Sequence, residues 1–154
     1  CTMNEGIVTA TTGSAGGIAG YAWSGTITGC KMTDGTVKAT VDYAGGIAGA
    51  IIGSVTISAC EITGGSVTAV SDSGGITGFN SGDITGCTIT GGTITATNKN
   101  AGGISVRLLY GSITDCTLTC VMVVSTNYAS GAIAGQKKGA ITYKLLNSVS
   151  LSHV

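Results

Sequence analysis

Ala44-Gly45-Gly46-Ile47-Ala48-Gly49 is the stretch that decides the fold, because close variants of it return along the chain at a nearly constant interval. Each copy has two small residues, usually both Gly, followed by Ile. The five isoleucines are separated by 29, 29, 28 and 29 residues, and they are Ile18, Ile47, Ile76, Ile104 and Ile133. A fixed interval of this length indicates a protein built from stacked repeats.

A cysteine keeps the same interval. The separations are 29, 30, 27 and 29 residues, for Cys1, Cys30, Cys60, Cys87 and Cys116. Seven residues after each cysteine stands a β-branched residue: Val8, Val37, Val67, Ile94 and Val123. Several columns in one register predict that like residues lie over like residues in a continuous core.

Within each copy the apolar residues alternate with hydroxyl residues, as in Thr93-Ile94-Thr95-Ala96-Thr97. A period of two is typical of strands with one buried face. The sequence therefore predicts an all-β fold, a parallel β-helix (β-solenoid) of about five turns of ~29 residues, with three short strands per turn. A β-propeller is the rival fold, but its blades need roughly 40 or more residues each.

The whole chain, residues 1–154, is expected to form one β-solenoid domain. The repeats fall at about 1–29, 30–59, 60–86, 87–115 and 116–143, with a partial copy at 144–154. In this partial copy we expect the cysteine column to pass to Lys144 or Leu145.

Composition restricts the function. Charged residues make up 9% of the chain, with 7 basic and 7 acidic residues, which argues against nucleic acid as a partner because binding it needs a basic stripe. No apolar run approaches the ~20 residues of a transmembrane segment. The Gly-rich stretches end strands instead of opening helices, so they are not phosphate loops, and we expect no cofactor.

Catalytic groups are sparse in the sequence. The one histidine is His153, and no His-Glu-x-x-His zinc motif is present. The acids are scattered over repeat phases, except that Asp42 and Asp72 both stand twelve residues after a cysteine. That pair could touch a cation or simply face solvent at a bend. We expect no metal site and no enzymatic activity.

The cysteines admit three interpretations: a metal site, axial disulfides, or a file of buried free thiols. Metal ligands converge from different directions, whereas these cysteines recur once per turn in one column. Side chains stacked in parallel strands fit the disulfide dihedral of about 90° poorly. We expect reduced thiols that pack as small apolar groups. Cys120 lies outside the column, at a bend, and is the expected reactive thiol.

Two segments resemble a known repeat. Gly16-Gly17-Ile18-Ala19-Gly20-Tyr21, followed by Gly25-Thr26-Ile27-Thr28-Gly29-Cys30, is similar to the GLUG repeat of bacterial surface and secreted proteins. That repeat has Asn before the Cys, where this chain has Gly29, Ala59, Gly86 or Asp115. The resemblance implies an extracellular or cell-surface location and a spacer or adhesive role.

The expected function is a non-enzymatic extracellular structural or adhesive repeat module, such as an adhesin-like stalk or spacer. The alternative is a self-assembling filament subunit whose copies stack head to tail. A lesser alternative is an ice-binding or glycan-binding solenoid, suggested by outward Thr files such as Thr88 with Thr90 and Thr117 with Thr119. The expected partners are further repeats or other copies stacked end to end, with glycans or a cell surface as additional candidates.

Overall fold

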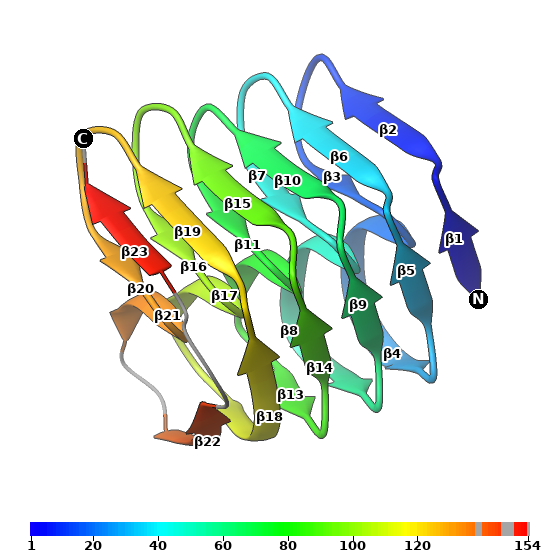
Figure 1. The fold of residues 1–154 in the computed structure, drawn as a ribbon. Helices are drawn as coiled ribbons and strands as arrows, with labels where there is room; N and C mark the ends of the chain where they lie inside the picture. The colour runs from blue at the N-terminus through cyan, green and yellow to red at the C-terminus, as the bar shows by residue number, and fades with distance from the viewer. Residues whose placement is uncertain (138–139, 146–149, 154) are drawn as a thin grey trace.

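The computed structural model describes residues 1–137, 140–145 and 150–153, and the side chains of residues 1–133. The described chain winds as a parallel β-solenoid, in which three sheets run side by side along the axis (Figure 1). Corresponding strands form five rungs separated by four complete turns, each of about 29 residues. The described residues contain strands and bends but no helix.

The strands belong to three sheets. The first sheet contains β1 (Thr2–Asn4), β4 (Ala19–Thr28), β5 (Lys31–Thr33), β8 (Ala48–Ser58), β9 (Glu61–Thr63), β12 (Thr77–Asn80), β13 (Asp83–Thr85), β14 (Thr88–Thr90), β17 (Ser105–Leu108), β18 (Ser112–Thr119), β21 (Ala134–Lys137) and β22 (Ala140–Leu145). The second contains β2 (Ile7–Ala10), β6 (Thr36–Ala39), β10 (Ser66–Ala69), β15 (Thr93–Ala96), β19 (Met122–Ser125) and β23 (Ser150–His153). The third contains β3 (Ala15–Gly16), β7 (Tyr43–Gly45), β11 (Asp72–Gly74), β16 (Ala101–Gly102) and β20 (Ser130–Gly131).

Pairing between turns is parallel and joins each residue to its equivalent one turn later. In the second sheet a single file runs through Val8, Val37, Val67, Ile94 and Val123. The sequence predicted this column from the cysteine spacing. The all-β, parallel β-solenoid prediction is confirmed.

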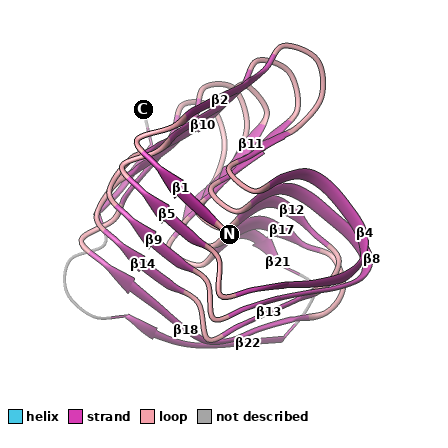
Figure 2. Ribbon diagram, turned by 90° about the vertical axis from the view of Figure 1, so that its right-hand side faces the viewer, coloured by secondary structure: helices cyan, strands magenta, loops and turns pink. Residues whose placement is uncertain are grey.

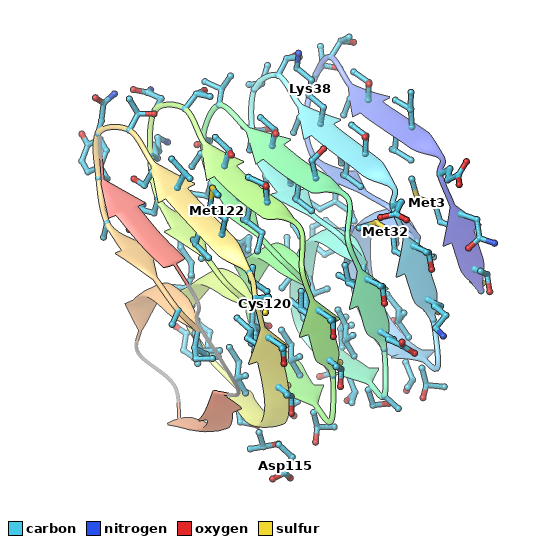
Figure 3. All side chains as sticks on the ribbon, viewed as in Figure 1. Met3, Met32, Lys38, Asp115, Cys120 and Met122 are labelled. Carbon is cyan, nitrogen blue, oxygen red and sulfur yellow. The ribbon has the colours of Figure 1, made fainter. Side chains whose placement is uncertain are left out.

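The core is made of small aliphatic side chains stacked in files. Ile47, Ile76 and Ile104 have no exposed surface, and Ile133 is 5% exposed. Ile18 is only half-buried because it belongs to the first rung, whose outer side no other turn of the structure covers. Met3 and Met32 point into the same interior from β1 and β5 (Figure 3).

The Gly-Gly-Ile segment forms a corner between the third and first sheets: its first glycine ends a strand of the third sheet, as Gly45 ends β7, and Gly46 and Ile47 lie in the bend that follows. In the view along the axis, the third sheet runs inward to this corner and the first sheet turns outward from it (Figure 2). A Cβ at Gly45 would overlap the carbonyl oxygen of Ala48, and one at Gly46 would meet that of Gly75 in the next turn. Close approach of backbone to backbone therefore requires both glycines.

Two other corners depend on left-handed backbone. The residues before the buried cysteines have positive φ: Gly29 at 61°, Ala59 at 50°, Gly86 at 61° and Asp115 at 53°. Gly, Asp and Asn adopt this left-handed conformation more easily than other residues. The GLUG repeat has Asn at this position, so Gly29, Gly86 and Asp115 replace it with residues that can adopt the same backbone conformation. Ala59 is the exception, since its Cβ makes the left-handed conformation costly.

The last rung differs from the expectation at the cysteine column. Tyr143 is in register with Cys116, and Lys144 and Leu145 follow in register with Thr117 and Leu118. A bulge between Ile113 and Cys116 shifts the register. Residues 146–149 and 154 of the partial copy lie outside the described residues.

Replacing Ala59 by Gly should raise the free energy of unfolding by about 1 kcal/mol, because it removes the left-handed strain of a Cβ. The matched control is Gly86→Ala in the next turn, where a Cβ would meet no atom within 4 Å, so that only the backbone strain is added. We expect this control to lower the free energy of unfolding by about 1 kcal/mol. Urea titration followed by circular dichroism measures both. A loss of stability in Ala59→Gly would contradict the strain.

Candidate functional site

The thiol column is buried from its second rung onward. Cys30, Cys60, Cys87 and Cys116 are at most 5% exposed. Each lies directly after the left-handed residue, and its Sγ donates to the carbonyl oxygen two residues earlier, at 3.3 to 3.6 Å. These weak S–H donations satisfy carbonyl groups at the tight corner. The thiols thus have a structural role in closing the turn.

All six cysteines are free in the structure. Hydrogen bonding with Cys116 and with Cys60, together with burial, raises the pKa of the Cys87 thiol. A thiol in this environment keeps its proton and is a poor nucleophile. Cys1 is exposed, which corrects the expectation of five buried thiols: its rung is the first, and no turn of the structure covers it.

Cys120 is exposed at the corner between β18 and β19, outside the column (Figure 3). Its φ of 55° places it in a second left-handed column with Glu5, Asp34, Gly64 and Gly91. A residue at this corner has its side chain in solvent, so Cys120 and Cys1 are the thiols open to reagents.

Asp72 does not stack on Asp42, which corrects the pairing expected from their distance to the cysteines. It lies in register with Tyr43 and has no exposed surface. Its Oδ1 accepts hydrogen bonds from the backbone N–H and the side-chain Nδ2 of Asn100, at 3.2 and 3.0 Å. Its Oδ2 lies 3.3 Å from Nε of Arg107. Asp72 is therefore neither a solvated bend residue nor an open cation ligand.

Aromatic side chains gather on the outer side of the corner around Asp72. Residues 1–100 contain four aromatic residues: Tyr21, Tyr43 and Phe79 lie there, and Trp23 follows Tyr21 by two residues on β4. The rings of Tyr43 and Phe79 are 5.3 Å apart and tilted by 44°. Tyr21 and Trp23 are 45% and 68% exposed. We call these four residues, with Arg107, the aromatic corner.

Three members of the aromatic corner occupy one file across the turns. Tyr21 pairs with Ala50, Ala50 with Phe79, and Phe79 with Arg107. Burial is the main cause that raises the pKa of Tyr43; Arg107 opposes it, and Asp72 adds to it. The Tyr43 hydroxyl is therefore protonated at neutral pH and can donate a hydrogen bond.

Sequence reasoning missed the aromatic corner, although a signal was present. Tyr21, Phe79 and Arg107 each stand three residues after the isoleucine of a Gly-Gly-Ile copy. Tyr43 stands four residues before such an isoleucine and comes from the neighbouring sheet. Because the corner folds the third sheet against the first, only the structure joins these two positions.

The outward Thr files are present in the expected register: Thr88 and Thr90 pair with Thr117 and Thr119. One file is interrupted by Lys31 and Glu61, whose side chains form a 2.9 Å ion pair. Hydroxyl groups elsewhere bond along the axis, as between Ser58 and Thr28 at 3.0 Å. Ice binding by these files stays a prediction.

The described residues contain no group of three or more His, Cys, Asp or Glu side chains placed to hold a metal ion. They contain no helix long and apolar enough to span a membrane. His153 belongs to β23, and its side chain is outside the described ones.

Comparison with known proteins supports the fold. No protein-family model matches the sequence, and no curated protein matches it. Among solved structures, a Bacteroides ovatus protein described as a "putative immunoglobulin A1 protease" superposes with a TM-score of 0.58 at 16% sequence identity. The alignment covers 99% of this chain and 60% of that one, so the present chain spans about three fifths of its length. At this identity the similarity shows a shared β-solenoid fold.

Thiol labelling of the native protein with a maleimide should modify Cys120 and Cys1 first, because both are exposed. The four buried thiols should react only after denaturation, since their burial keeps the reagent from reaching them. Peptide mass spectrometry after partial labelling gives the order. Early modification of Cys60 or Cys87, or an axial disulfide between them, would contradict the buried column.

Proposed function

We propose that this chain is a non-enzymatic structural and adhesive module of an extracellular or cell-surface protein, an adhesin-like stalk or spacer. The observation that carries the proposal is the axial register: every turn repeats the same inward residues, so turns can be added without changing the core. The resemblance to the GLUG repeat of bacterial surface and secreted proteins supports the location.

The acidic side chains support a structural role, because those with a partner in the structure contact residues of a neighbouring turn. Glu61 pairs with Lys31 of the preceding turn. Asp72 binds Asn100 and Arg107 of the following turn. The Oδ1 of Asp83 accepts hydrogen bonds from the N–H and hydroxyl of Ser112, at 2.9 and 2.7 Å. These carboxylates tie neighbouring turns together.

The protease description belongs to the Bacteroides ovatus protein, of which this chain matches part of the length. We propose that the part shared by the two proteins is a solenoid scaffold. In a longer protein such a scaffold can carry or space other domains.

Duplicating one turn tests the spacer proposal. A second copy of residues 31–60 inserted after Cys60 joins Cys60 to Lys31, which occupies the same register position as Glu61. We expect a folded protein that is longer by about 5 Å in small-angle X-ray scattering, the spacing of one strand. Its unfolding midpoint should rise, because an added repeat adds an interface. The control inserts the same residues in scrambled order, and an unfolded duplicate would contradict the proposal.

The alternative function, a filament subunit that stacks head to tail, is favoured by the first rung. Within the described part of the chain no strand pairs with the outer edge of β1, β2 or β3. Val8 is half-buried there, whereas its equivalent Val37 has no exposed surface. An unpaired parallel edge is a template for another chain, and head-to-tail contacts of this kind do not close.

Val8→Lys tests this alternative, because it puts a charge on the inward file of the exposed edge. Thr9→Lys is the matched control, since Thr9 is the neighbouring outward residue. Sedimentation velocity at rising concentration should show association of the native chain and of Thr9→Lys, and its loss in Val8→Lys. Native protein that stays monomeric, or two variants that behave alike, would rule out edge stacking between copies.

A further inference from the structure

We propose that the aromatic corner binds an uncharged polysaccharide, along the solenoid axis, through flat pyranose rings. This deepens the adhesive part of the proposed function and rests on it. The aromatic corner concentrates the ring side chains of a chain that is only 5% aromatic. Binding sites for small organic groups combine aromatic surface with a few fixed polar groups, and this corner has both.

The exposed rings supply a stacking surface. Tyr21 and Trp23 lie two residues apart on β4, with the inward Ala22 between them, so that the two rings share the outer face of the strand. Phe79 continues the file two turns further on. Exposed apolar groups that gather in one place, unlike single ones, often mark a binding surface.

The spacing of this file suits a repeating ligand. Equivalent residues of neighbouring turns lie about 4.8 Å apart, which is close to the length of one sugar ring in an extended chain. The file runs through Tyr21, Ala50, Phe79 and Arg107 on four successive rungs, and of these Ala50 has no exposed surface. A straight chain of β-1,4-linked rings along the file therefore places about one unit at each rung, with Tyr21 and Phe79 as the rings on which it can stack.

Polar groups further along the file suit the hydroxyl groups of a sugar. Arg107 has five N–H donors, and its side chain is 31% exposed. The single oxygen Oδ2 of Asp72 cannot accept from all five, so donors of Arg107 remain for a ligand. Asp72 is held in turn by two hydrogen bonds from Asn100, which fixes the position of the guanidinium. The neutral hydroxyl of Tyr43, on β7 of the third sheet, adds a further donor.

Charge selects among ring-shaped ligands. The single cation of the aromatic corner, Arg107, is paired with the buried Asp72, so the corner has no net positive charge. Single-stranded nucleic acid also stacks on aromatic rings, but it needs a positively charged track for its phosphates. The same argument disfavours acidic polysaccharides. An uncharged glycan remains as the ligand that stacks on the rings and needs no counter-charge.

Trp23 makes the test direct, because it is the only tryptophan of the chain. The probes are hexasaccharides of β-1,4-linked glucose, mannose and N-acetylglucosamine, each titrated into the full chain. We expect at least one to shift Trp23 emission to shorter wavelength and protect it from acrylamide quenching, with affinity rising from disaccharide to hexasaccharide. Polygalacturonate and oligo-dT serve as charged competitors and should compete poorly.

Variants separate the site from the fold. Tyr21→Ala should weaken binding by about tenfold, as expected for loss of one stacking ring. Tyr128→Ala is the matched control, because Tyr128 is an exposed tyrosine on the loop before β20. It should bind as the native chain does, and both variants should keep the native unfolding midpoint.

Three outcomes would overturn the proposal. These are a Trp23 emission that responds to none of the three hexasaccharides, equal binding by the two tyrosine variants, and preferential binding of a charged competitor that salt abolishes. A failure of this kind leaves the turn-duplication result untouched. An unfolded duplicate with intact Trp23 binding would instead overturn the spacer function.

Discussion

Parallel pairing of each residue with its own equivalent one turn later is the constraint on which this structure depends. Strands spaced at about 4.8 Å put identical positions into direct contact, so every inward position becomes a file of similar side chains. The file of Val8, Val37, Val67, Ile94 and Val123 illustrates the result. A core of this kind needs no large aromatic groups, because neighbouring turns fill the space that each turn leaves.

The corners impose a second set of demands, and these explain the unusual glycine content. One corner brings backbone so close to backbone that Gly45 and Gly46 have no room for a Cβ. Two others need left-handed residues, and at one of them the buried cysteines follow directly and donate to nearby carbonyl groups. Cysteine is suited to this position because it is small, apolar enough for the core and still a weak donor.

Surface features of the solenoid are then free to vary, since outward residues do not decide the stack. Glu61, Asp72 and Asp83 use that freedom to link adjacent turns. The aromatic corner uses it differently, by collecting rings that the core does not contain. A structural repeat can in this way carry a binding surface without any change in its fold, and the surface can differ between one protein with this fold and another.

The sequence by itself determined the repeat length, the parallel stacking and most of the inward files, because these follow from residues at fixed separation along one chain. It did not determine the partners of Asp72, since a loop shorter by one residue moves Asp72 from the Asp42 position into register with Tyr43. It also did not join Tyr43, which lies in the third sheet, to Tyr21 and Phe79, which both lie in the first sheet. Only the tertiary structure decided that contact, because it depends on how sharply the backbone turns at the Gly-Gly corner, and that angle is set by packing between turns.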